Sequence, residues 1–215
     1  SASKKYQRWL DCDYDFKSGV PEKKGILFKE FITSELIPFI DSSYRTTAFR
    51  TIVGHSFTAN YINYFLLDEK PVFSGYVSIS PYFADNSLDL IRIAVAELKA
   101  PVFYFVSCGD KDLSGHVQSV KGFDAIFSKI QNENFNYAKF ESTNNQATHY
   151  TILPISIPAA IEHVFSLYSP ISNKEFQKIL KVENQYGYLI KRYKNLEAIY
   201  GMKVEIREDD LNLMS

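Results

Sequence analysis

The chain has 215 residues with 46% hydrophobic side chains, which is enough to bury one sizeable core. Its formal net charge of -1 excludes the basic surface by which proteins bind nucleic acids or anionic membranes, and no stretch reaches the ~20 apolar residues of a membrane span. Two cysteines are too few for a disulfide framework. We therefore expect a soluble protein, cytoplasmic or periplasmic after removal of a signal, with no nucleic-acid partner.

Predicted helices and strands alternate along the chain. Apolar residues at three- and four-residue spacing predict helices over residues 25–41, 57–67, 88–98, 117–130 and 158–168. Apolar runs rich in β-branched and aromatic residues predict strands over residues 50–53, 73–79, 102–106 and 135–140. Crossovers of helical length between nearly continuous apolar strands predict an α/β fold, with a parallel sheet covered by helices on both faces, in a domain of residues 1–170.

Residues 171–215 are predicted to form a helical C-terminal extension. Ser172 followed by Glu175 is a capping-box pattern, and an apolar stripe ends at Gly201, which is typical of a helix C-cap. A break in the helix is expected near Gly187. The pattern favours helices docked on the main domain, and a homodimer contact or a lid near the active site are the alternatives.

A strand-to-helix turn at Ser56 is the most informative motif. The apolar run that ends at Gly54 is followed by His55, Ser56 and then a helical pattern, which predicts a nucleophile elbow. Such a turn exposes the serine hydroxyl and directs backbone N–H groups of the new helix toward the group that the serine attacks. The motif has a glycine two residues after the serine, where this chain has Thr58.

A serine nucleophile needs a base that takes its proton and an acid that orients the base. In a parallel sheet these side chains belong on loops at the carboxyl ends of the strands. Asp112 follows the third predicted strand and His149 follows the fourth, and the order serine, acid, histidine is that of nucleophile-elbow folds. Asp110 shares the acidic turn and is the alternative acid, and Glu141 is a lesser candidate.

The remaining histidines and Cys108 have weaker claims to chemistry. His116 lies close to the acidic turn and is a rival base. His55 is more typical of a structural residue on the other side of the elbow, and His163 is expected on the surface or packing face of a helix. Cys108 is interpreted as a small buried hydrophobic residue rather than a catalytic thiol. No pair of histidines has the spacing of a metal site.

These motifs together resemble the putative esterase family of α/β-hydrolases, which includes the enterochelin esterases and their periplasmic relatives. The resemblance runs from about residue 26 to the end of the chain. It is carried by residues 31–40, Tyr44-Arg45-Thr46, Ile52-Val53-Gly54-His55-Ser56-Phe57, residues 78–83, residues 108–112, Thr148-His149 and Ile199-Tyr200-Gly201.

The resemblance implies a serine carboxylic ester hydrolase that forms an acyl-enzyme from a small-molecule ester, with no metal or organic cofactor. Carried onto this chain, it makes Ser56 the nucleophile, His149 the general base and Asp112 the orienting acid. The backbone N–H of Phe57 becomes an oxyanion donor. The loop at residues 80–83 resembles the segment that lines the acyl or alcohol pocket, and the candidate pocket residues are His55, Tyr82 and Phe83.

Two departures from the family pattern modify this expectation. The β-branched Thr58 should crowd the close packing of helix against strand. Family members also have several strands before the helix at residues 25–41, so we expect strand 50–53 to be an open edge of an N-terminally truncated sheet, in a chain that was cleaved or that another chain completes. The absent region normally supplies the second oxyanion N–H. The alternative function is therefore a catalytically weakened or inactive esterase-like protein that serves as a binding or assembly module.

Overall fold

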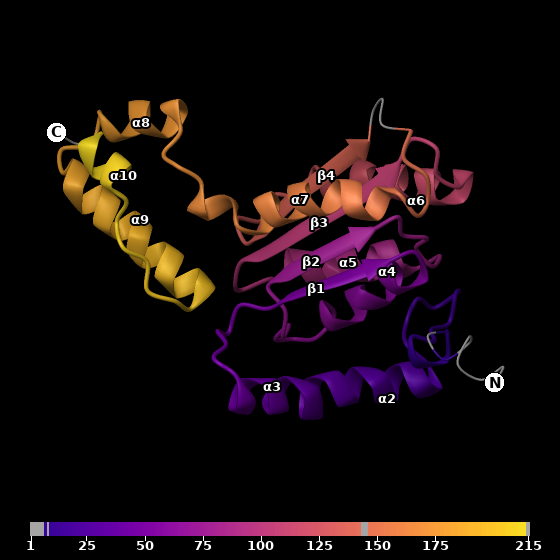
Figure 1. Ribbon diagram of the computed structural model, residues 1–215. Helices are drawn as coiled ribbons and strands as arrows, with labels where there is room; N and C mark the ends of the chain where they lie inside the picture. The colour runs from indigo at the N-terminus through magenta and orange to yellow at the C-terminus, as the bar shows by residue number, and fades with distance from the viewer. Residues whose placement is uncertain (1–6, 8, 143–145, 214–215) are drawn as a thin grey trace. The chain divides into compact units, whose positions relative to one another are not determined.

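The computed structural model describes residues 7, 9–142 and 146–213, which form two compact units (Figure 1). The first comprises the described residues up to Thr46 together with Arg50–Val164. The second comprises Thr47–Phe49 and the described residues from Phe165 onward. The division that the sequence suggests, into a hydrolase domain of residues 1–170 and a helical extension of residues 171–215, stays a prediction.

A four-stranded parallel sheet organises the first unit. Strands β1 (Thr51–His55), β2 (Gly75–Ile79), β3 (Val102–Gly109) and β4 (Phe135–Ser142) lie side by side in chain order, and every neighbouring pair is parallel. The predicted α/β class is confirmed. Because all four strands run the same way, the loops that follow them meet at one edge of the sheet.

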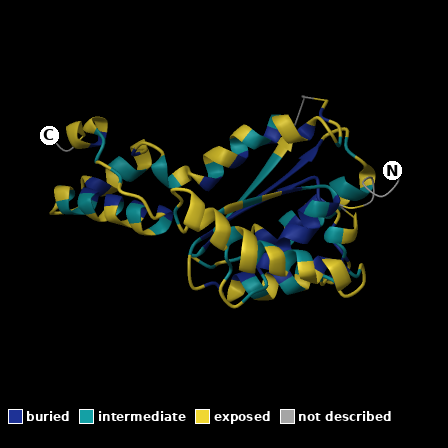
Figure 2. Ribbon diagram, turned by 60° about the horizontal axis from the view of Figure 1, so that its bottom comes forward, coloured by how far each residue is buried: buried dark blue, intermediate teal, exposed yellow. Residues whose placement is uncertain are grey.

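Helices cover both faces of this sheet, and the strand side chains alternate between the two layers. Tyr104 and Val106 of β3 belong to the aromatic core formed with α4 (Phe57–Tyr61), α5 (Ser87–Ala96) and α6 (Ser114–Phe127). Phe103 and Phe105, which point the other way, contact His163 of α7 (Ile152–Val164). Figure 2 shows the resulting pattern, with buried strands between helices that expose their outer faces.

The remaining helical segments have the following bounds. In the first unit α2 (Lys23–Phe31) continues through a π-helical stretch (Ile32–Leu36) into α3 (Ile37–Ser43), and a 3-10 turn (Ile62–Phe65) extends α4. In the second unit a 3-10 turn (Ser166–Tyr168) precedes α8 (Asn173–Ile179), α9 (Gln185–Tyr200) and α10 (Glu208–Asn212). No helix in the described ranges combines the length and apolar character needed to cross a membrane.

The start of α7 differs from the prediction. Pro158 was expected to begin this helix, but it lies inside a helix that begins at Ile152. Buried residues recur at four-residue spacing along one face of α7, namely Ile152, Ser156, Ala160 and Val164. Packing of this face against the sheet outweighs the single backbone hydrogen bond that the proline removes.

Strand β1 is the edge of the sheet among the described residues, as the sequence predicted. It pairs with β2 only, and Val53 is 50% exposed. Residues 50, 52, 54 and 56 direct their backbone groups toward β2, as the hydrogen bond from the N–H of Ser56 to the carbonyl of Ile79 shows. The backbone groups of residues 51, 53 and 55 therefore face the open edge.

The second unit bears out the predicted helix signals. The hydroxyl of Ser172 accepts from the N–H of Glu175 and caps α8, and Gly201 ends α9 in the left-handed region with φ 67°. The predicted break near Gly187 lies between the end of α8 and the start of α9, and Gly187 itself is in the first turn of α9. The side chain of Asn184 accepts from the N–H of Gly187 at 2.7 Å and caps the helix there.

A buried carboxylate joins three segments of the second unit. Asp210 of α10 is 1% exposed, and its oxygens accept from the hydroxyl of Tyr193 at 2.7 Å and from the N–H of Ile171 at 3.4 Å. Arg207 Nε lies 3.5 Å from the same carboxylate. Asp210 thus ties α10 to α9 and to the segment before α8.

We predict that Asp210→Ala lowers the free energy of unfolding of the second unit by about 2–3 kcal/mol, because a charged acceptor is lost from a buried hydrogen bond. Hydrogen exchange over residues 165–213 should accelerate, while exchange in β2 and β3 should not. Asp209→Ala is the matched control, since Asp209 is exposed on the same helix. Equal protection in the two variants would contradict the assignment.

Candidate active site

Ser56 lies in a tight turn between β1 and α4. Its backbone has φ 61° and ψ -124°, a region that residues other than glycine rarely adopt. The helix passes so close to the strand that a Cβ on Gly54 would collide with the carbonyl oxygen of Thr58. The glycine at position 54 therefore permits the turn, and Phe57 begins the helix directly after the serine.

Three predicted side chains come together at the carboxyl edge of the sheet. Ser56 Oγ lies 2.9 Å from His149 Nε2, and His149 Nδ1 lies 2.8 Å from Asp112 Oδ1. Because a carboxylate only accepts, Nδ1–H of the imidazole donates to Asp112 and leaves Nε2 free to accept the serine proton. The arrangement is that of a nucleophile, a base and an acid that orients the base.

The alternative acids lie elsewhere. Asp110 accepts from the backbone N–H of Ala147 at 2.7 Å, so it holds the loop that precedes His149 rather than the imidazole itself. Glu141 is exposed and pairs with Lys139 at 2.7 Å. Asp112 is the one of the three carboxylates that the structure brings to His149.

The electrostatic environment keeps Asp112 ionised. Burial raises the pKa of its carboxyl, but hydrogen bonds from Ser80, His149 and the N–H of Leu113 outweigh that effect and place the pKa below its ordinary value. Cys108 lies beside the same carboxyl, and burial together with Asp112 raises the pKa of its thiol to about 12. At neutral pH the thiol stays protonated, which agrees with a packing role.

Two further histidines flank His149. The ring of His55 lies 4.8 Å from it, and Nε2–H of His55 donates to the carbonyl of His149 at 2.7 Å. The ring of His116 lies 4.6 Å away edge-on, and its Nδ1–H donates to the carbonyl of Ser80 at 2.8 Å. His55 therefore supports the histidine loop, and His116 is anchored to the backbone instead of contacting Ser56 Oγ. His163 packs inside the fold, where its Nε2 bonds to Asn136.

Thr58 does not crowd the turn as the sequence suggested. Its hydroxyl donates to the carbonyl of His55 at 2.9 Å and accepts from the N–H of His55 at 3.0 Å. These two backbone groups face the open edge of β1, so the threonine satisfies polar groups that a neighbouring strand would otherwise pair. The substitution for glycine is accommodated because the side chain points toward the edge.

Asp112, His116 and His149 also form a cluster of potential metal ligands, with ligand atoms within 4.8 Å of one another. The geometry fits hydrogen bonds better than an ion. The 2.8 Å separation of His149 Nδ1 and Asp112 Oδ1 is shorter than the ~3.3 Å that two ligands of a tetrahedral zinc ion with ~2.0–2.1 Å bonds would keep. Both Nδ1 atoms already donate to oxygen. The expected absence of a metal stays a prediction.

A cavity of about 330 Å³ is lined by residues 82–85, Leu88 of α5 and one face of α6, and Ser56, Asp112, His116 and His149 are not among its lining residues. The ring of Tyr82 is half exposed and lies 5.7 Å from that of His116. Phe83 is buried and stacks on Phe123 at 4.9 Å, so it forms a wall rather than a free surface. His55, the third candidate pocket residue, does not line this cavity.

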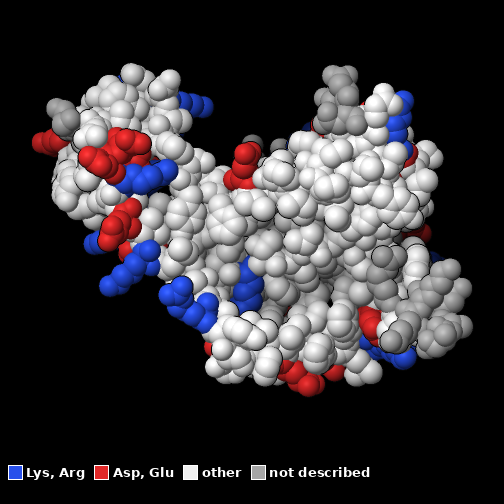
Figure 3. Space-filling view, viewed as in Figure 1, with Lys and Arg blue, Asp and Glu red and all other residues white. Residues whose placement is uncertain are grey.

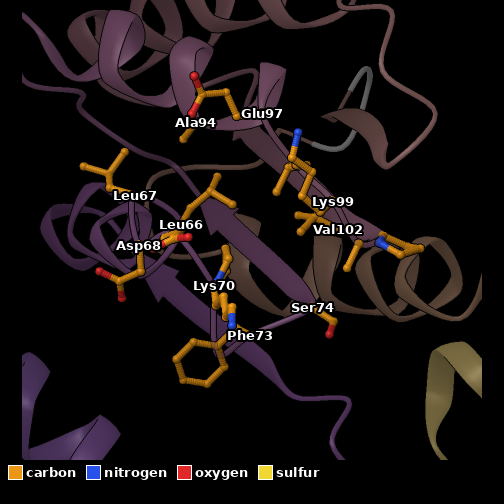
Figure 4. Close-up of a pocket in the computed structure, with 15 residues that line it drawn as sticks. Leu66, Leu67, Asp68, Lys70, Phe73, Ser74, Ala94, Glu97, Lys99 and Val102 are labelled. Atoms are coloured by element: carbon orange, nitrogen blue, oxygen red, sulfur yellow. The ribbon is translucent and has the colours of Figure 1, made fainter.

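A larger cavity lies at the opposite end of the strands. It has a volume of about 570 Å³ and is walled by Leu66, Phe73, Leu98 and Val102 (Figure 4). Its rim carries acidic and basic side chains, among them Asp68, Lys70, Glu97 and Lys99. Val102 is the first residue of β3, so this cavity is at the amino ends of the strands, away from Ser56.

Figure 3 shows that acidic and basic side chains are interspersed on one face of the molecule.

The sequence matches the family described as "Putative esterase" over residues 2–157. The match therefore begins earlier than the resemblance expected from about residue 26, and it ends before α8, α9 and α10. No curated protein matches the chain.

Several solved structures share the fold. An uncharacterised protein from Capnocytophaga ochracea DSM 7271 is 22% identical, with a TM-score of 0.76 over 98% of this chain and 64% of its own. An IroE-like serine hydrolase from Shewanella oneidensis is 20% identical (TM-score 0.60, 88% and 60% covered), and a BES protein from Bacillus cereus is 17% identical (TM-score 0.61, 72% and 63% covered). The chain thus spans about three fifths of the length of these solved chains.

We predict that Thr58→Val lowers the free energy of unfolding by about 1 kcal/mol, since the hydroxyl that pairs with the N–H and carbonyl of His55 is lost without a change in shape. The amide of His55 should exchange faster with solvent. Thr33→Val is the control, because its hydroxyl bonds only to carbonyls of the preceding helical turn. Unchanged exchange at His55 in the Thr58 variant would show that the hydroxyl is dispensable.

Proposed function

The chain belongs to the putative esterase family, and on that premise we propose that it is a serine carboxylic ester hydrolase that uses Ser56, Asp112 and His149 as a catalytic triad. One observation carries the proposal. A continuous chain of hydrogen bonds of 2.9 and 2.8 Å runs from the serine hydroxyl through the imidazole to a carboxylate, at the carboxyl edge of a parallel sheet. Each residue comes from the loop after a different strand, which is the order expected of a nucleophile-elbow fold.

The acylation step follows from the positions of these atoms. His149 Nε2 takes the proton of Ser56 as Oγ attacks the carbonyl carbon of the ester. Asp112 holds the imidazole in the tautomer with a proton on Nδ1 and stabilises the imidazolium that forms. His149 then gives its proton to the leaving alkoxide as the tetrahedral intermediate collapses, and the acyl group remains on Oγ.

Deacylation repeats the same proton transfers with water as the nucleophile. His149 removes a proton from the water, the hydroxide attacks the acyl carbonyl, and the proton returns to Oγ as the acid departs. The N–H of Phe57, which directly follows the serine at the start of α4, is the proposed donor to the negatively charged oxygen. No metal or organic cofactor takes part in this proposal.

The proposed substrate is a small-molecule ester. The cavity of about 330 Å³ beside Tyr82 and Phe83 is the proposed site for its acyl or alcohol part. A cavity of this volume lies at the small end of the range for ligand sites, so short acyl groups such as acetate or butyrate are suitable probes.

We predict that Ser56→Ala lowers turnover of p-nitrophenyl acetate or butyrate by about 10⁴-fold or more, because the nucleophile is removed. Adding His149→Ala should lower the rate little further, since the two residues act as a unit. A fluorophosphonate probe should label the unmodified chain at Ser56 and fail to label the variant. Ser128→Ala, which changes an exposed serine at the end of α6, is the control.

Unchanged turnover in Ser56→Ala, or labelling of another residue, would refute the assignment. An unmodified chain that neither turns over the esters nor reacts with the probe would favour the second function, a binding or assembly module that keeps the fold without the activity.

The two aspartates of the acidic turn give a matched pair of variants. Asp112→Asn should lower kcat by about 10⁴-fold, because an amide can donate to Nδ1 and so favours the wrong tautomer of His149. Asp110→Asn should have a smaller effect, since this side chain contacts the backbone of Ala147 rather than the imidazole. Steady-state kinetics with p-nitrophenyl butyrate decide between them, and a larger loss in the Asp110 variant would reverse the assignment of the acid.

A further inference from the structure

Ser80 occupies an unusual position directly after β2. It is fully buried, and its φ of 49° lies in the left-handed region that serine rarely adopts. Its N–H donates to the carbonyl of Ser107 at 2.7 Å, so the strained residue is held by the neighbouring strand. A strained, buried polar residue at the carboxyl edge of a parallel sheet calls for a functional explanation.

The hydroxyl of Ser80 contacts the acid of the proposed triad. It donates to Asp112 Oδ2 at 2.6 Å, a short distance that is typical of a hydrogen bond to an ionised acceptor. Asp112 Oδ1 meanwhile accepts from His149 and from the N–H of Leu113. The other partner of Oδ2 is the thiol of Cys108 at 3.5 Å, which is a weak donor.

Ser80 is also close to the two imidazoles on either side of it. Its Oγ lies 2.9 Å from His149 Nδ1, and its carbonyl accepts from His116 Nδ1 at 2.8 Å. One residue therefore contacts the acid, the base and the histidine that packs edge-on against the base. The other buried serines at this level do not: Ser78 bonds to the carbonyl of Ala59, and Ser107 bonds to Ser156.

We propose that Ser80 is a positioning residue for the triad, whose hydroxyl holds Oδ2 of Asp112 so that Oδ1 faces His149. This role rests on the proposed esterase function. A carboxylate can rotate about its bond to Cβ, and its second oxygen needs a fixed partner if the first is to keep its direction. The residue that makes this contact is also the one held in the left-handed region directly after β2.

The test compares Ser80→Gly with Ser80→Ala in the full chain. Glycine removes the hydroxyl and tolerates the positive φ, so this variant separates the loss of the hydrogen bond from backbone strain. In both variants kcat for p-nitrophenyl butyrate should fall by about ten- to a hundredfold, the factor expected for one hydrogen bond to a charged group, with KM nearly unchanged. Ser156→Ala, which removes another buried serine hydroxyl, is the control and should retain kcat.

A double variant distinguishes positioning through Asp112 from general damage. In an Asp112→Asn background the orienting carboxylate is already absent, so adding Ser80→Gly should lower kcat by less than about twofold. Multiplication of the two separate effects, or an unchanged kcat in Ser80→Gly alone, would overturn the proposal.

A spectroscopic measurement decides the contact independently of activity. The ¹³C resonance of the Asp112 carboxyl should titrate at a lower pH in the unmodified chain than in Ser80→Gly, because the donated hydrogen bond favours the charged form. The titratable groups facing this carboxyl are His149, Cys108 and, across Ser80, His116. Identical titrations would refute the role of Ser80, whereas a shifted titration in a protein that hydrolyses no ester would refute the proposed function alone.

Discussion

The close approach of α4 to β1 is the constraint on which the candidate site depends. The backbone of Thr58 lies where a side chain on Gly54 would be, so the chain must turn from strand to helix within one residue. Ser56 is that residue, and it takes a left-handed φ to do so. Since all four strands are parallel, the loops carrying Asp112 and His149 end at the same edge as this turn. The parallel direction of the strands and this one tight turn together bring Ser56 close to His149.

Backbone contacts between loops then fix the base and the acid relative to each other. The N–H of Lys111 donates to the carbonyl of Ala147 at 2.8 Å, and Asp110 accepts from the N–H of the same alanine. His55 adds a hydrogen bond to the carbonyl of His149. The acidic turn after β3 is thus joined to the histidine loop two residues before His149, and β1 holds the backbone of His149 itself. Groups outside the proposed triad would supply part of the preorganisation that the proposed catalysis requires.

The sequence was sufficient to predict the parallel sheet and the residues that meet at its edge. Ser56, Asp112 and His149 each follow an apolar run, and the rule about strand ends needs no knowledge of contacts. The sequence did not predict the start of α7, because tertiary packing of one helix face outweighs the local signal of Pro158. The role of Thr58 was missed for a similar reason, since a hydroxyl that bonds to an open strand edge leaves no periodic pattern. Ser80 follows β2 at the same edge, and the rule applied to Asp112 would have found it.

The two non-glycine residues with positive φ at the site, Ser56 and Ser80, share one structural solution. Each directly follows a strand, and each extends the ladder by one hydrogen bond to the next strand, from Ser56 N–H to Ile79 and from Ser80 N–H to Ser107. Such a conformation costs of order 1–3 kcal/mol and persists only where the surroundings determine it. The strands β2 and β3, whose residues are all buried, supply those carbonyls. At this edge of the sheet, the two strained serines are the residues whose hydroxyls lie within hydrogen-bond distance of His149 and Asp112.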